Sequence, residues 1–157
     1  MYNHTPADYV NPFQLLLEGK LVPKYGDQTE FIFYSDEHIT AFVPTSSEPQ
    51  NQGNALIIPN KAYENLYDIS DDVLAKIHIF SKRLALAMKE LYGCDGVSVR
   101  QHNEPAGYQE VWHYHLHVIP RYIDDNLYPN YLNKARSDDT IRKEYAQKLR
   151  DYFSKNN

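Results

Sequence analysis

The stretch Val111–Pro120, VWHYHLHVIP, decides the expected fold and points to the expected site. Hydrophobic residues alternate here with His113, His115 and His117. In a β-strand, side chains at i, i+2 and i+4 point to one face, about 6–7 Å apart along the strand. The alternation therefore predicts a strand over 111–119 that Pro120 ends. One face would carry three imidazoles, and the other would pack on the core with Trp112, Tyr114, Leu116 and Val118.

The flanking sequence predicts an α+β fold, with an antiparallel meander sheet, one long helix packed on it, and short N-terminal and C-terminal helices. Ser70 is the expected N-cap of the long helix and Gly93 its C-terminal stop, with apolar residues at helical spacing between them. A terminal helix is expected to start near Ser137. The other expected elements are a short helix over 11–19 and strands over 30–35, 39–43, 55–58 and 96–100.

Composition limits the classes of protein. The 157 residues suit one domain over 1–157, with 124–157 as a C-terminal extension that includes the terminal helix. No apolar run approaches the ~20 residues of a membrane span. Sixteen basic against 21 acidic residues give a net charge of −5, which argues against a nucleic-acid partner. A polar N-terminus and a single cysteine, Cys94, favour a cytoplasmic protein.

A row of imidazoles has three interpretations. It could be a solvated strand face. It could bind a metal ion, since imidazole is the commonest zinc ligand. Histidines at i and i+2 can reach one ion, but the third lies ~13 Å from the first, so a further ligand such as His102 or Glu110 would be needed. It could also be a nucleophile site, in which the central imidazole attacks and its neighbours orient it.

A resemblance favours the third interpretation. Residues 103–121, NEPAGYQEVWHYHLHVIPR, resemble the signature of the histidine-triad (HIT) superfamily. Upstream, EFIFYSDEHITAFVP resembles the strand pair that opens the family's sheet, and NALIIPNKAYENLYDIS resembles its strand, turn and helix entry. The resemblance covers about residues 11–123.

The resemblance implies roles by position. His115 would be the nucleophile that forms a nucleotidyl-histidine, His113 would fix it by hydrogen bonding, and His117 would contact the phosphate or tune the nucleophile. Asn103 and Gln109 match positions that contact phosphate oxygens. The leaving group would lie near Glu110 and Arg121, although a surface ion pair is an equally good role for Arg121. Phe13, Ile32 and Phe42 would form walls of the base pocket or pack in the core.

Several positions depart from the family pattern. Asn11–Gln14 replaces the Cys-x-x-Cys pair of some relatives, so we expect no structural zinc. Asn54 and Ala62 stand where histidines are common, and Pro44 stands where an acidic residue binds ribose. Glu110 replaces a Ser or Thr that assists the leaving group.

The sequence therefore predicts a nucleotide hydrolase or transferase that cleaves at the α-phosphate. Arg121 after "VIP" resembles the family's dinucleoside-polyphosphate hydrolase branch, and a nucleoside phosphoramidase is the alternative. No cofactor is required, although Mg²⁺ could accompany a polyphosphate. From other classes, a nucleotide-binding regulator with weak turnover or a metal-binding protein remain open. The resemblance also implies a homodimer, with Ile77, Phe80 and Leu84 either at its interface or in the core of one chain.

Overall fold

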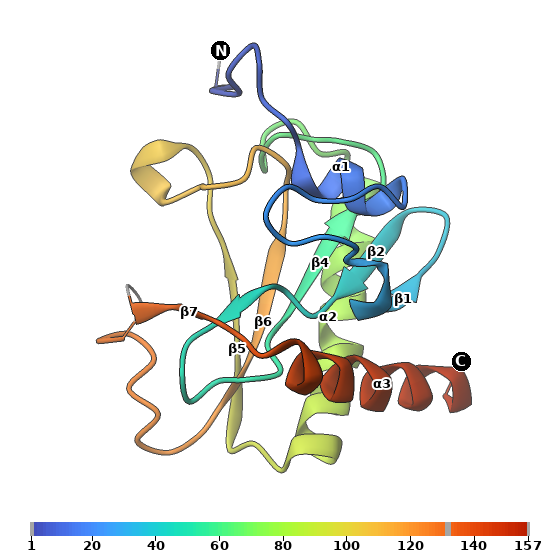
Figure 1. Cartoon of the computed structure of the whole chain (residues 1–157), viewed down its shortest axis with the longest axis vertical. Coiled ribbons are helices and arrows are strands. Elements are labelled where there is room, and N and C mark those ends of the chain that lie inside the picture. Colours follow the sequence, from blue (N-terminus) through green and yellow to red (C-terminus); the bar gives the residue numbers. More distant parts are fainter. Residues whose placement is uncertain (1, 131–132, 157) are drawn as a thin grey trace.

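The computed structural model describes residues 2–130 and 133–156. Its five-stranded antiparallel sheet has the order β1-β2-β4-β6-β5. The α+β antiparallel fold is confirmed, with one departure from sequential order: β6 lies between β4 and β5 (Figure 1). The strands of this sheet are β1 Ile32–Ser35, β2 Ile39–Phe42, β4 Ala55–Pro59, β5 Gly96–Gln101 and β6 Leu116–Arg121. The other strands, β3 Ser46–Ser47 and β7 Ala135–Arg136, pair with each other.

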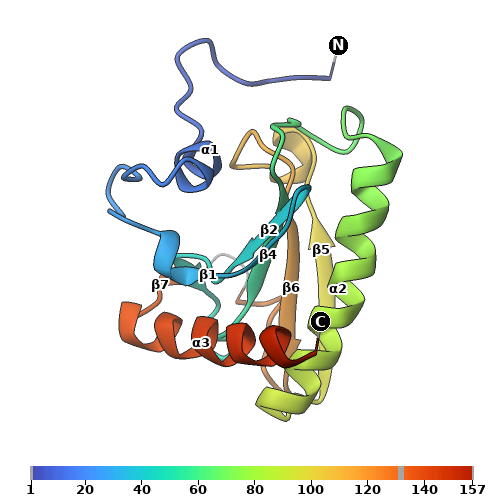
Figure 2. The same cartoon turned by 90° about the vertical axis from the view of Figure 1, so that its right-hand side faces the viewer.

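The short helix α1 and the long helix α2 cover opposite faces of the sheet, and the terminal helix α3 crosses its end (Figure 2). The short helix α1 begins after Asn11, whose side chain caps it. The long helix α2 ends where Gly93 adopts a left-handed conformation with φ of 62°. The helices are α1 Pro12–Leu17, α2 Asp71–Tyr92 and α3 Asp139–Lys155, and two short 3₁₀ turns are η1 Thr29–Phe31 and η2 Pro105–Gly107.

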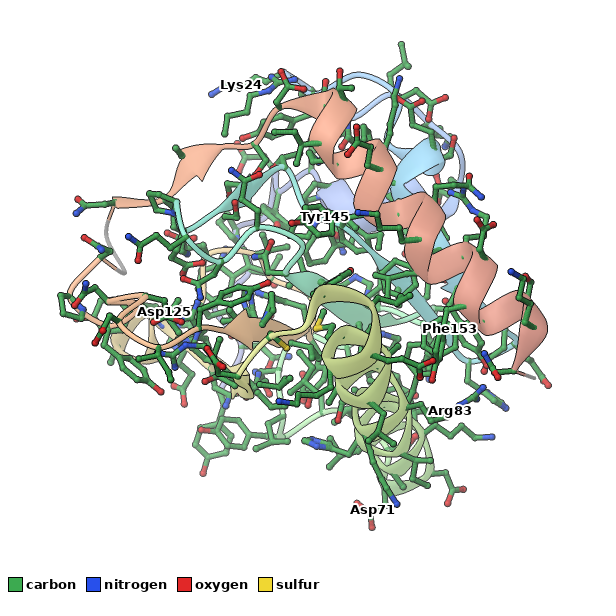
Figure 3. The ribbon with its side chains drawn as sticks, turned by 90° about the horizontal axis from the view of Figure 1, so that it is seen from below. Lys24, Asp71, Arg83, Asp125, Tyr145 and Phe153 are labelled. Atoms are coloured by element: carbon green, nitrogen blue, oxygen red, sulfur yellow. The ribbon has the colours of Figure 1, made fainter. Side chains whose placement is uncertain are left out.

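The main core lies between the sheet, α2 and α3. Phe153 of α3 packs among Phe33, Tyr34 and Phe80, which joins α3 to β1 and to α2. Figure 3 shows this junction from below, with Arg83 beside Phe153. On the other sheet face, α1 covers a smaller apolar cluster of Phe13, Leu16, Phe42, Leu56 and Ile58.

Three residues considered for a subunit interface belong to this main core. Ile77, Phe80 and Leu84 of α2 are all buried within the chain. An interface role for them is therefore wrong, because their side of the helix faces the sheet. Among the described residues, no helix is both long and apolar enough to cross a bilayer.

Candidate active site

The strand that carries the histidines begins later than predicted. β6 starts at Leu116, so His117 lies on the strand, and His113 and His115 lie in the segment before it. The β4–β6 register would place residue 114 opposite Pro59. Since proline has no N–H, the ladder cannot continue there.

Pro120 does not end the strand as predicted. It pairs with Val97, and β6 continues to Arg121. The Pro120 carbonyl accepts from Asn51 Nδ2 at 2.8 Å rather than from β5. In a strand, the nitrogen and the carbonyl of one residue point to the same side. The Pro120 nitrogen therefore also points away from β5, and the missing N–H costs no hydrogen bond between β5 and β6.

The alternation holds from Tyr114 onward, whereas Trp112, predicted on the core face, is only half-buried and lies in neither apolar cluster. Tyr114, Leu116 and Val118 are buried in the main core on one side. His115 and His117 line a pocket on the other side.

His113 is buried and held at both ring nitrogens. Its Nε2 donates to the carbonyl of Pro59 at 2.9 Å. Because a carbonyl only accepts, Nε2 carries the proton, and Nδ1 can accept from Asn11 Nδ2 at 3.0 Å. Burial lowers the pKa of His113, so the ring is neutral. The hydrogen bond between His113 and His115 is made by the His113 backbone carbonyl, whereas the His113 ring contacts Pro59 and Asn11.

His115 is held in the tautomer that a nucleophile needs. Its Nδ1 donates to the His113 carbonyl at 2.8 Å, which leaves Nε2 without a proton. Burial lowers the pKa of His115 to about 4. The edge of Phe13 packs against the ring at 5.4 Å between centroids. Near neutral pH, His115 therefore presents an unprotonated nitrogen.

Two further imidazoles continue from His115. His117 lies 5.0 Å from His115 between ring centroids, and His102 lies 5.9 Å beyond His117. Burial, followed by the nearby His115 and Arg100, holds the pKa of His117 well below its ordinary value. His102 donates from Nδ1 to the Gly107 carbonyl at 2.7 Å, and burial lowers its pKa. The result is a row of neutral rings.

The pocket is a cavity of about 240 Å³ with chemically different ends. One row of paired residues crosses the sheet from Phe42 through Leu56 and His117 to Arg100. Adjacent strands lie about 4.8 Å apart, so this row is about 14 Å long. The apolar end is lined by Pro12, Phe13, Leu16, Val22, Phe42 and Leu56, and the polar end by Glu48, Arg100, His102, Tyr108, Glu110 and Lys134.

Two cations stand at the polar end, each with a carboxylate. Arg100 pairs with the buried Glu48 at 3.2 Å. Lys134 lies 3.7 Å from Glu110, whose side chain is 80% exposed. An exposed ion pair at that distance is weak. Glu110 can therefore yield to an incoming anion, whereas Glu48 holds the Arg100 guanidinium in place.

The predicted pocket residues are brought together only in part. Phe13, Phe42 and Glu110 line the cavity with His115 and His117. Ile32 instead packs against the small apolar cluster and does not line the cavity, so its place in the base pocket stays a prediction.

Two predicted phosphate contacts serve the loop that precedes the triad. Asn103 accepts from Leu66 N, and Gln109 bridges three backbone groups of that region. Neither lines the cavity, and a phosphate role for them stays a prediction.

Arg121 binds Asp125 and Ser98 rather than pointing into the pocket. Its guanidinium holds Asp125 through two hydrogen bonds of 2.7 and 2.8 Å and donates to Ser98 at 2.9 Å. It does not line the pocket, and a place for it near the leaving group stays a prediction. The ion-pair alternative is the one found, and it secures the loop after β6.

The sequence left several site residues without a role. Arg100 was missed, although strand alternation would have placed it on the His102 face of β5. Glu48, Lys134 and Asn11 carry no local signal, because they reach the site through tertiary contacts. Within residues 2–130 and 133–156, no group of three or more His, Cys, Asp or Glu side chains is arranged to hold a metal ion.

The fold and site together define a histidine-triad protein. Residues 26–124 match the HIT domain, and the chain belongs to that family. The match ends where the predicted C-terminal extension begins; the division into domains stays a prediction. An uncharacterised HIT-like protein of Methanocaldococcus jannaschii is 37% identical over 94 residues, which cover 60% of this chain and 70% of that protein.

Two other relatives inform the comparison. A crystal structure of a HIT-like protein from Bartonella henselae matches with a TM-score of 0.74 at 31% identity, covering 93% of this chain and 98% of that chain. The adenosine 5′-monophosphoramidase of Saccharomyces cerevisiae is 42% identical over 74 residues, which cover 47% of this chain and 44% of that protein. The family thus includes hydrolases such as this yeast phosphoramidase.

Proposed function

We propose that the protein is a nucleotide hydrolase or transferase in which His115 attacks the α-phosphorus. The observation that carries the proposal is the hydrogen bond from His115 Nδ1 to the His113 carbonyl, which leaves Nε2 unprotonated. A pKa of about 4 keeps this ring neutral at physiological pH. Family membership is consistent with the chemistry.

The reaction proceeds in two displacements. His115 Nε2 forms a bond to phosphorus, and the leaving group departs with the electron pair of the broken bond. Water, or another acceptor, then attacks the same phosphorus. The P–N bond breaks, its electron pair returns to His115, and the proton of the water passes to solvent. A neutral imidazole needs no metal for this attack, and Mg²⁺ would only accompany a polyphosphate; turnover in excess EDTA tests this.

The two ends of the pocket orient the substrate. The nucleoside would lie at the apolar end, against Phe13 and Phe42, whose rings pack on each other, and the leaving group would point along the row toward Arg100. Lys134 stands at that end as well. Two cations favour an anionic leaving group, so we propose dinucleoside polyphosphates as the substrate class. Arg100 and Lys134, rather than Arg121, thus support this substrate class.

The nucleophile is tested by His115→Asn, with His78→Asn on the exposed side of α2 as the matched control. The wild type and the control, quenched during turnover of diadenosine tetraphosphate, should carry a nucleotidyl adduct in intact mass spectra. His115→Asn should carry none and lose turnover on the order of 10³-fold or more. Unchanged turnover in His115→Asn would overturn the assignment.

The leaving group is tested by comparing diadenosine tetraphosphate with adenosine phosphoramidate. Arg100→Met and Lys134→Met should each lower kcat/KM for the tetraphosphate by roughly 10-fold or more, since a charge-assisted hydrogen bond is worth about 1.5–3 kcal/mol. The phosphoramidate should be much less affected. The yeast relative favours the phosphoramidase alternative. Higher kcat/KM for the phosphoramidate, with no effect of either substitution, would establish that alternative.

We also propose a homodimer. Ile79 and Leu86 lie seven residues apart on α2 and are 64% and 57% exposed. Val99, 47% exposed, lies on β5, an edge strand of the sheet. Sedimentation should give twice the chain mass, and Val99→Lys should give monomers; a monomeric wild type would contradict the proposal.

A cytoplasmic location is proposed from the free, buried Cys94 and is tested by cell fractionation.

A further inference from the structure

Arg142 of α3 is a buried cation with an unusual set of partners. Its side chain is only 1% exposed. The guanidinium donates to the Val43 and Pro44 carbonyls at 2.9 and 2.8 Å and to Gln28 Oε1 at 2.8 Å. Its single carboxylate partner, Asp139 at 2.9 Å, is 45% exposed. Most of the hydrogen bonds that this buried guanidinium donates thus go to neutral acceptors.

These acceptors belong to the nucleoside end of the pocket. Gln28 and Pro44 line the cavity, and Val43 follows Phe42, which lines it too. Gln28 also donates from Nε2 to the carbonyl of Tyr25, a further lining residue, at 2.5 Å. Arg142 therefore joins two walls, one from the segment before β1 and one from the segment after β2.

The guanidinium is fixed rigidly at this joint. It lies 3.5 Å from the ring centroid of Phe31, a fully buried residue. Within the described chain, no residue of α3 itself lines the cavity. Arg142 would therefore act on a ligand only through the residues it holds, as a positioning residue. Helix α3 also lies outside the part of the chain that matches the HIT domain; Figure 1 shows it crossing the end of the sheet.

We infer that Arg142 positions the walls that hold the nucleoside part of the nucleotide, so that α3 sets nucleotide affinity without touching the ligand. This inference rests on the proposed function. It predicts a loss of affinity for the nucleoside monophosphate itself, whatever leaving group a substrate carries. The chemical step at His115 is unaffected once the nucleotide is bound.

The same helix offers a matched control. Arg150 also donates to two backbone carbonyls, of Glu30 and Ile32, at 2.9 and 2.7 Å. Neither of these residues lines the cavity. Arg150→Met therefore removes a comparable attachment of α3 and leaves the pocket walls in place.

The experiment measures AMP binding by calorimetry, together with kcat and KM for diadenosine tetraphosphate and the unfolding midpoint. Arg142→Met should raise the Kd of AMP and the KM by about 10-fold, with kcat within about threefold of the wild type. Arg150→Met should lower the unfolding midpoint and leave the Kd unchanged. An unchanged Kd in Arg142→Met would overturn the inference.

Arg142→Lys keeps a buried cation, and so the fold, but loses the planar fork that reaches several acceptors at once. Its Kd for AMP should rise several-fold, and a wild-type Kd in this variant would equally overturn the inference. AMP binding needs no turnover, so these results are independent of the nucleophile test. A wild-type protein that binds no AMP would overturn the proposed function and this inference with it.

Discussion

At His113 and His115, a backbone carbonyl fixes the proton on each imidazole ring. The Pro59 carbonyl holds the proton of His113 on Nε2, and the His113 carbonyl holds the proton of His115 on Nδ1. Asn11 completes the chain, because its Nδ2 donates to His113 and its Oδ1 caps α1. His115, the proposed nucleophile, is thus oriented by a main-chain group, and its spacing from His113 matters mainly because it puts the His113 carbonyl within reach.

The pH dependence of kcat/KM follows from the His115 ring. Protonation removes the Nε2 lone pair, and burial lowers the pKa to about 4. The rate with diadenosine tetraphosphate should therefore stay constant as pH falls from 8 to about 5, and then decline with a midpoint near 4. An exposed histidine would place that midpoint near 6.5. A stopped assay with nucleotide separation measures it, and an acid limb centred at 6 or above would contradict the assignment of a buried neutral nucleophile.

Substitutions can separate the two roles of Asn11, the contact with His113 and the cap of α1. Asn11→Asp keeps the oxygen that caps α1 but cannot donate to His113 Nδ1. We expect near wild-type stability and a kcat reduced roughly 10-fold, in line with the loss of one neutral hydrogen bond of about 1 kcal/mol or slightly more. Asn11→Ala should lose the cap as well, at about 1 kcal/mol in urea unfolding.

The control for capping alone is Asp138→Ala, since Asp138 caps α3 through Thr140 N and Ile141 N. It should lose about 1 kcal/mol of stability and keep kcat. Equal kcat in Asn11→Asp and the wild type would show that Asn11 is only a cap.

At the scale of elements, the sequence predicted what local periodicity can encode. Ser70 and Gly93 predicted the start and the end of α2, and both are confirmed, although the Ser70 side chain makes no capping hydrogen bond. The paired two-residue strands β3 and β7 were missed, because SS and AR are too short to show any alternation. The late start of β6 depended on a partner, Pro59, that only the register identifies.

Substitutions at Gly53 and Gly93 test whether the loop before β4 packs closely against α3. Both have positive φ, of 83° and 62°, but a Cβ at Gly53 would lie 2.6 Å from the Tyr145 ring, whereas Gly93 has open space. Figure 3 shows Tyr145 on the side of α3 that faces the molecule. Gly93→Ala should cost about 1–2 kcal/mol of unfolding free energy for the left-handed backbone alone. Gly53→Ala should cost about 2–4 kcal/mol, because overpacking adds to the strain. Equal losses in urea unfolding would contradict the close contact.

At the scale of the whole molecule, the pocket is assembled from segments between Pro12 and Lys134 and braced from behind by Arg142. The row of histidines was predictable, because it lies within five consecutive residues. The polar end was not, because Arg100 and Lys134 are 34 residues apart and meet only through the sheet order and the β3–β7 pair. The histidine row, encoded in one short segment, could be predicted from sequence, whereas the residues of the polar end are brought together only by the tertiary fold.

The same buried imidazoles make the stability of the whole protein depend on pH. Burial lowers the pKa of His102, His113, His115 and His117. Below pH 6.5 the unfolded chain binds protons at these rings while the folded chain does not, so the free energy of unfolding falls as pH falls. For His115 alone, with a folded pKa of about 4, the loss between pH 8 and pH 5 is about 2 kcal/mol. Urea unfolding at fixed protein concentration should show this decline. His115→Asn, which cannot titrate, should remove about that 2 kcal/mol of it, whereas His78→Asn should not. Stability that stays constant from pH 8 to pH 5 would mean that these rings are not buried neutral in the folded protein, and the nucleophile would lose the environment that sets its pKa.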